Sequence, residues 1–76
     1  MEILDQGKTT ILRDYKNIYV RERYDGETEV VAEYAGNDNI LLVLGRYPNI
    51  GRAKEVLGTL ARGIGIGLHM FRMPEK

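Results

Sequence analysis

The residues best suited to bind an anion gather in and just before one segment, residues 46–65. Arg52, Lys54 and Arg62 lie off the apolar stripe of a predicted helix there. A helix amino terminus attracts anions through its free N–H groups and its dipole. Arginine adds forked donors that suit phosphate, and a tyrosine ring can stack on a base. The predicted ligand-binding residues are Arg46, Tyr47, Arg52, Gly58, Arg62 and, as a weaker candidate, Arg72.

Two glycines inside this helix need an explanation. Glycine costs about 1 kcal/mol relative to alanine in a helix interior, yet Gly51 and Gly58 both occur here. A glycine lets another group approach the backbone closely. We therefore expect a ligand or a second subunit to lie against the helix. The alternative is that Arg52 and Arg62 are ordinary solvated charges and that the glycines allow packing against another copy.

Residues for catalysis are missing. The chain has no serine and no cysteine, so the usual nucleophiles are absent. Carboxylates such as Glu29 on a predicted strand are typical of a solvated face. The glycines of residues 63–67 follow a helix, whereas a dinucleotide-binding motif must follow a strand. With a single histidine, His69, which we expect to be half-buried or at an interface, a zinc site is not predicted. We expect no enzyme activity, no metal and no cofactor.

Size and composition indicate one small folded domain, residues 1–76. The formal net charge is zero, which argues against a surface built wholly for nucleic acid. A chain of this length buries little surface, and it has no cysteine for disulfides. Self-association as a dimer or tetramer, through the helix or the last strand, is therefore expected. The absence of cysteine fits the cytoplasm. The polar amino terminus predicts no signal peptide, and no apolar run is long enough to predict a membrane span.

The first two thirds of the chain alternate with the period of two that is typical of strands. We expect strands over residues 9–13 and 17–24, a type I′ turn at Asp25-Gly26, a returning strand over 30–35, and a second turn over 36–39. The apolar stretch 40–47 predicts a central strand that is covered on both faces. Glu2–Leu4 is expected at one edge of this meander.

The period then changes to that of a helix. Ala53, Val56, Leu57, Leu60, Ala61 and Ile64 form its apolar stripe. Asn49 is the predicted N-cap, and Gly63 or Gly65 is the predicted left-handed residue at its end. Alternation over residues 66–71 predicts a last strand that rejoins the sheet. The predicted fold is α+β, an antiparallel β-meander of about four to six strands with a single amphipathic helix packed on one face.

Short motifs give the chain a family resemblance over most of its length, strongest after residue 40. They are Leu44-Gly45-Arg46-Tyr47, Arg52-Ala53-Lys54-Glu55-Val56-Leu57 and Phe71-Arg72-Met73-Pro74-Glu75. In these the chain resembles very short proteins of phages and mobile elements of Gram-positive bacteria, which often carry "GEY", "A-K-K-V-L" and a terminal "F-x-M-P". It departs from them at Arg46, where the family often has an acid. Pro48-Asn49-Ile50-Gly51 replaces a Ser/Glu-rich helix start.

The resemblance implies a function. Characterised relatives act as oligomeric sponges that sequester cyclic nucleotide signals of CBASS-type antiphage defence, in the cytoplasm of the host bacterial cell. For this chain it implies binding of a cyclic dinucleotide such as cyclic GMP-AMP, or an ADP-ribose-derived signal, without cleavage.

Two other classes stay open. A phage protein that inhibits or adapts another protein would use an exposed strand edge as its contact. A nucleic-acid-binding module would use Arg13, Lys16, Arg21 and Arg23, but acidic residues interleave them.

Overall fold

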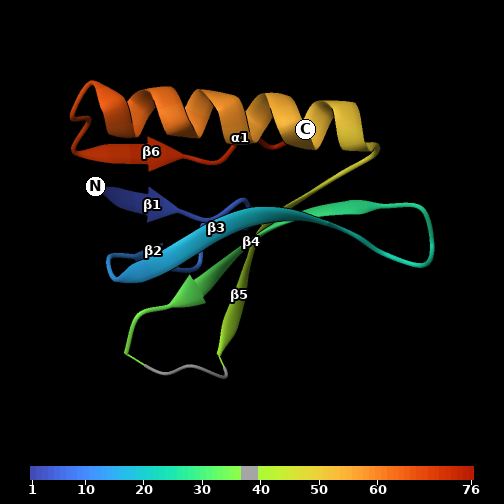
Figure 1. The fold of residues 1–76 in the computed structure, drawn as a ribbon, viewed down its shortest axis with the longest axis horizontal. Coiled ribbons are helices and arrows are strands. Elements are labelled where there is room, and N and C mark those ends of the chain that lie inside the picture. The colour runs from blue at the N-terminus through green and yellow to red at the C-terminus, as the bar shows by residue number, and fades with distance from the viewer. Residues whose placement is uncertain (37–39) are drawn as a thin grey trace.

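The computed structural model describes residues 1–36 and 40–76, which form six strands and one helix. The elements are β1 (Glu2–Leu4), β2 (Ile11–Leu12), β3 (Tyr15–Glu22), β4 (Thr28–Tyr34), β5 (Leu41–Tyr47), α1 (Ile50–Gly65) and β6 (Met70–Arg72). Helix α1 lies across one face of the sheet formed by β3, β4 and β5 (Figure 1). The predicted α+β class, with one helix packed on a largely antiparallel arrangement of strands, is confirmed.

Strands β3, β4 and β5 form an antiparallel sheet in that order. The hairpin between β3 and β4 differs from the predicted type I′ turn. The Arg23 N–H donates to the Glu27 carbonyl at 2.8 Å, and the Gly26 N–H donates to the Arg23 carbonyl at 3.1 Å. Gly26 has φ +90°, but Asp25 does not have the positive φ that a type I′ turn requires. The prediction is therefore wrong, and a three-residue loop ending in Gly26 closes the hairpin.

The prediction that residues 40–47 form a central strand is also wrong, because β4 occupies the centre and β5 an edge. The apolar start of β5 is not covered, since Leu41 is 44% exposed, but Gln6 covers the edge farther along the strand. The Gln6 N–H donates to the Leu44 carbonyl at 2.7 Å. Its side-chain amide accepts from the Arg46 N–H at 2.8 Å and donates to the Arg46 carbonyl at 3.0 Å. The segment after β1 thus covers the outer edge of β5. The turn predicted over 36–39 lies mostly outside the described residues.

The remaining strands form a second sheet in the order β2-β1-β6. Strand β1 pairs antiparallel with β2 and parallel with β6, with Ile3 opposite both Leu12 and Phe71. Three predictions are corrected here. The strand expected over residues 9–13 pairs with β1 and not with the meander, Glu2–Leu4 is not an edge of the meander, and the last strand does not rejoin it. A parallel pair needs a long crossover, and the meander and α1 together supply it.

Helix α1 begins as predicted. The Asn49 side chain accepts from the Arg52 N–H at 2.8 Å, which confirms Asn49 as the N-cap. Its end differs from the prediction. Gly67, not Gly63 or Gly65, is left-handed with φ +75°. The Leu68 N–H donates to the Gly63 carbonyl and the Gly67 N–H to the Ile64 carbonyl, which is a Schellman motif.

The core lies between α1 and both sheets. Ala53, Val56, Leu60 and Gly63 are the buried residues of α1. Leu57 is half-buried, whereas Ala61 and Ile64, predicted on the same stripe, are exposed. A Cβ on Gly63 would meet Leu68 at 3.0 Å, so this glycine permits close packing. In the part of the chain that is described, the helix is too short and too polar to cross a membrane.

Candidate functional site

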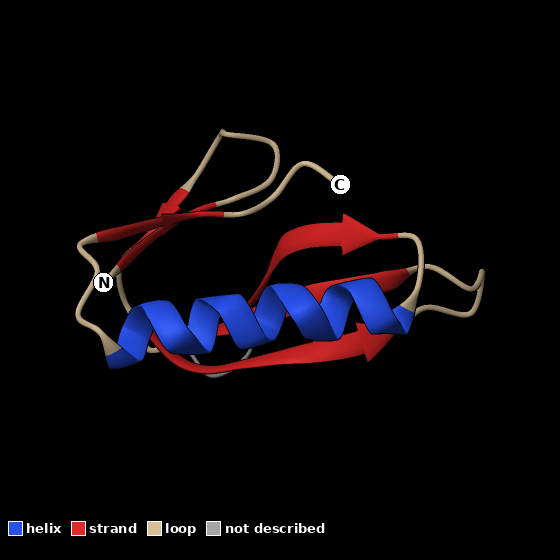
Figure 2. Cartoon of the chain, turned by 90° about the horizontal axis from the view of Figure 1, so that it is seen from above, coloured by secondary structure: helices blue, strands red, loops and turns tan. Residues whose placement is uncertain are grey.

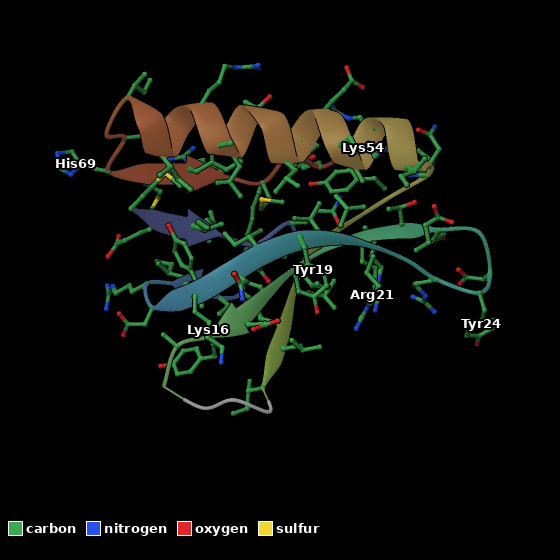
Figure 3. The ribbon with its side chains drawn as sticks, viewed as in Figure 1. Lys16, Tyr19, Arg21, Tyr24, Lys54 and His69 are labelled. Carbon is green, nitrogen blue, oxygen red and sulfur yellow. The ribbon has the colours of Figure 1, made fainter. Side chains whose placement is uncertain are left out.

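A hollow of about 550 Å³ runs along the outer face of α1, away from the core. Ligand sites of small molecules usually span 300–1,000 Å³. We call this hollow the helix groove. Its positive charges come from Arg52, Lys54 and Arg62, and it also holds the Glu55 carboxylate. Figure 3 shows Lys54 on α1, on the side of the molecule opposite to Arg21. The groove is lined by Gly51, Arg52, Lys54, Glu55, Gly58, Thr59 and Arg62.

The guanidinium of Arg52 is held by two residues that do not line the groove, Lys76 and Tyr47. Its Nε and Nη2 atoms donate to the main-chain oxygen of Lys76 at 2.9 and 2.6 Å. The guanidinium carbon also lies 5.9 Å from the ring centroid of Tyr47, within range of a cation–π contact. Arg62 is less constrained, since Nη2 donates to Thr59 Oγ1 at 3.3 Å. The carboxyl-terminal segment therefore positions the Arg52 guanidinium next to the first turn of the helix.

Gly58 lies in the middle of the groove with free space around it. A Cβ built at this position meets nothing within 4 Å. Packing within the chain therefore gives no reason for glycine here. A Cβ on Gly51 would come within 3.3 Å of the Asn49 Oδ1 atom that caps the helix, so this glycine relieves crowding at the cap.

The structure brings together half of the predicted ligand-binding residues. Arg52, Gly58 and Arg62 share the helix groove. Arg72 is exposed on β6, in the other sheet. Arg46 points to the face of the β3-β4-β5 sheet that α1 does not cover, where it pairs with Glu29. These two arginines therefore do not belong to the same site as Arg52 and Arg62.

Tyr47 does not fit its predicted role in stacking. Its side chain belongs to the core and is 2% exposed. The hydroxyl donates to the Pro74 carbonyl at 2.8 Å. Burial raises the pKa of Tyr47 to about 12, against the opposing charge of Arg52. Tyr47 faces the core because the pairing of β4 with β5 contains a bulge between Val30 and Val31, which shifts the register before Tyr47.

A second cluster, which sequence reasoning missed, lies on the uncovered face of the sheet. We call it the arginine cluster: Arg21, Arg23 and Arg46 around Glu29. Glu29 Oε1 accepts from Arg21 Nη2 at 2.7 Å and Oε2 accepts from Arg46 Nε at 3.0 Å, with Arg23 Nη1 at 3.7 Å. The Glu29 side chain is 4% exposed. The expectation that this carboxylate belongs to a solvated face is therefore wrong.

Charge explains why the sheet can bury this carboxylate. Burial by itself would raise the pKa of Glu29, but hydrogen bonds from Arg21 and Arg46 and the charges of Arg21 and Arg23 outweigh it, so the pKa lies below its ordinary value. The cross-strand register places Arg21 and Arg46 on either side of Glu29. That register follows from turn positions, which residue spacing did not reveal. A shallow hollow of about 460 Å³ borders this cluster.

His69 is exposed, at the end of the molecule where α1 finishes (Figure 3). Its placement differs from the half-buried one expected. Within residues 1–36 and 40–76, no three histidine, aspartate or glutamate side chains are grouped so that they could hold a metal.

The fold and the helix groove define the chain as a small α+β protein with a cationic helix face. Comparisons with protein-family models, with curated proteins and with solved structures find no match.

Proposed function

We propose that this protein binds a cyclic nucleotide signal in the helix groove and holds it without cleaving it. The observation that carries the proposal is the placement of Arg52, Lys54 and Arg62 around Gly58, whose backbone is open to a ligand. Phosphates would take donors from the guanidinium groups, and the first turn of α1 adds a favourable dipole. The resemblance to phage-encoded sponges supplies the ligand class, a cyclic dinucleotide such as cyclic GMP-AMP or an ADP-ribose-derived signal.

Retention without chemistry suits the residues of the groove. Cleavage of a phosphodiester needs a positioned base or a metal-activated nucleophile. Thr59 is the hydroxyl in the groove, and its Oγ1 donates to the Glu55 carbonyl of the preceding turn at 3.0 Å. Arg62 rather than a base contacts that oxygen. The groove residues therefore favour binding over catalysis.

Titration calorimetry tests this proposal. The protein is titrated with cyclic dinucleotides, cyclic ADP-ribose isomers, DNA and RNA, and bound nucleotide is then released by denaturation and analysed by mass spectrometry. We expect saturable binding of a cyclic nucleotide that is recovered unchanged. A linearised product, or heat signals from DNA or RNA alone, would overturn the proposal.

A protein-directed inhibitor or adaptor is the second candidate, because strand β3 leaves one edge of the sheet open. A nucleic-acid-binding role is less well supported. Arg13 pairs with Glu2 at 2.6 Å, Lys16 lies 4.0 Å from Glu33, and Arg21 pairs with Glu29 at 2.7 Å. Carboxylates thus accompany the basic residues of that region, which weakens the attraction for a phosphate backbone.

A further inference from the structure

The two edges of the β3-β4-β5 sheet are treated differently by the fold. Gln6 and its neighbours cover the edge at β5. Within residues 1–36 and 40–76, β4 is the strand that pairs with β3, and none pairs with its outer edge. At eight residues, β3 is long for an open edge, and such an edge is a template for another strand.

The hairpin fixes which backbone groups of β3 point outward. Arg23 bonds to Glu27 across the hairpin. In an antiparallel pair, residues that bond to the partner strand alternate with residues that do not. Tyr19 and Arg21 therefore direct their N–H and C=O groups toward β4. Ile18, Val20 and Glu22 direct theirs to the open edge.

An apolar flank of α1 borders this edge. Leu57, Ala61 and Ile64 line a groove of about 280 Å³ together with Tyr15 and Ile18 of β3. Ile64 is 47% exposed. Figure 2 shows α1 running closer to β3 than to β5. An open strand edge and an exposed apolar helix flank thus lie side by side.

We infer that the occupant of this edge is a second copy of the chain, paired β3 to β3 in antiparallel fashion about a two-fold axis at Tyr19. The two sheets would join into one sheet of six strands. This inference stands on the edge of the sheet and does not depend on the proposed ligand.

Self-complementarity favours this occupant and this register. With Tyr19 on the axis, Ile18 lies opposite Val20 of the second copy, and both have outward-facing backbone groups. Asn17 then lies opposite Arg21, so no like charges are directly opposed. The regular register ends there, because Lys16 is the extra residue of a bulge in β3. A register centred on Val20 would instead place the Glu22 carboxylate opposite apolar Ile18. An isologous contact of this kind buries the same surface twice.

The helices support the same arrangement. Adjacent strands are 4.7–4.9 Å apart, and packed helices are about 8–10 Å apart. Because α1 lies toward β3, pairing through β3 brings the flanks of two helices face to face. Leu57, Ala61 and Ile64 would then be covered by the same residues of the second copy.

A single-cysteine experiment tests the axis directly, because the natural chain has no cysteine. In the proposed register, residue 19 meets its own copy as a non-hydrogen-bonded pair, which has the Cα spacing that a disulfide needs. Under mild oxidation we expect Tyr19→Cys to form a covalent dimer in high yield. Tyr24→Cys, at the fully exposed hairpin tip, is the control and should stay monomeric.

Sedimentation equilibrium provides the second arm, without a change to β3. Ala61 and Thr59 are both exposed on α1. Ala61→Glu places a charge on the apolar flank and should weaken dimerisation at least tenfold. Thr59→Glu adds the same charge to the helix groove and should leave the dimer intact. Circular dichroism confirms that both variants fold.

The inference is overturned if the wild-type chain is monomeric at several hundred micromolar. It is equally overturned if Tyr24→Cys cross-links as fast as Tyr19→Cys, or if Ala61→Glu assembles like the wild type. The ligand proposal is tested separately by nucleotide binding. Ala61→Glu should still bind the nucleotide, whereas Thr59→Glu should lose this binding.

Discussion

At the scale of single residues, Glu29 orients the arginine side chains on the uncovered face of the sheet. One carboxylate fixes arginines from three places: β3, the β3–β4 hairpin and β5. The arginines remain partly exposed, but their guanidinium groups are oriented. The guanidinium groups of Arg21 and Arg46 are therefore held by a single buried charge, whereas Arg23 also pairs with Asp25 at 3.3 Å.

The lowered pKa of Glu29 makes stability depend on pH. A carboxyl whose pKa is lower in the folded state stabilises the fold above its ordinary pKa of 4.5, and that stabilisation is lost as the pH falls through the folded value. We expect Glu29→Gln to cost about 1–3 kcal/mol at pH 7 and to flatten the loss of stability below pH 4.5. Urea unfolding of both proteins from pH 7 to pH 3 measures this. Parallel curves for the two proteins would contradict it.

The charges of the helix groove give a second prediction. Hydrogen bonds to charged groups contribute about 1.5–3 kcal/mol. Arg62→Ala should therefore weaken nucleotide binding by roughly ten- to a hundredfold. Arg46→Ala removes the same charge from the opposite face of the sheet and should leave the affinity unchanged. Calorimetric titration compares the two variants, and an equal loss in both would show that the ligand lies elsewhere.

Residue types alone predicted the cationic helix face but not its limits. Arg52 and Arg62 follow from the helical period. Arg46 is close to them in sequence, yet the strand that carries it directs its side chain to the far face. Tyr47 is directed into the core by a β-bulge beside Gly45. A glycine inside a strand can signal such a bulge, but the prediction of a regular strand over residues 40–47 did not use this signal.

At the scale of elements, the glycines of β5 and α1 serve different purposes. A Cβ on Gly45 would come within 2.7–3.0 Å of the Tyr47 ring, which is buried and held by Pro74. Gly45 is thus required by close packing. Gly58 has open space and no such requirement within the chain.

Alanine substitutions separate these two glycines. Gly45→Ala should destabilise the fold by about 1–3 kcal/mol, as overpacking does. Gly58→Ala should stabilise α1 by up to about 1 kcal/mol while it weakens nucleotide binding, since a methyl group enters the groove. Thermal unfolding and calorimetry measure both. A more stable Gly58→Ala protein with unchanged affinity would mean that the ligand does not touch α1.

The elements themselves were predictable where local signals determine them. Asn49 and the spacing of apolar residues located α1, and alternation located β3 and β4. The apolar run of β5 was misleading, because β5 is an edge strand whose first residue, Leu41, is exposed, and Gln6, far away in the sequence, covers part of its edge. Hydrophobicity alone does not distinguish an edge strand that a distant loop covers from a strand at the centre of a sheet.

At the scale of the whole molecule, the pairing of β1 with β6 joins the two ends of the chain. Such a contact has no local signal, which is why the second sheet was not predicted. The pairing also means that Ile3 and Phe71 enter the core from opposite ends of the sequence. Closing this part of the core therefore closes a long loop, which costs more chain entropy than a local contact.

Assembly through β3 would affect stability at this scale. Association that favours the folded state makes the melting temperature rise with protein concentration. When the protein concentration is raised from about 5 to about 500 µM, we expect the melting temperature of the wild type to rise. The rise should be much smaller for Ala61→Glu. Differential scanning calorimetry measures it. A melting temperature independent of concentration in the wild type would contradict pairing of two copies.

The central claim, that a cyclic nucleotide binds in the helix groove, is tested most directly by amide chemical shifts. Isotope-labelled protein is titrated with the cyclic nucleotide that binds in calorimetry, and the shifts are mapped by residue. The proposal predicts the largest changes between Gly51 and Arg62, with small changes at Arg21, Glu29 and Arg46. Changes that centre on the arginine cluster, or no changes at saturating nucleotide, would contradict it.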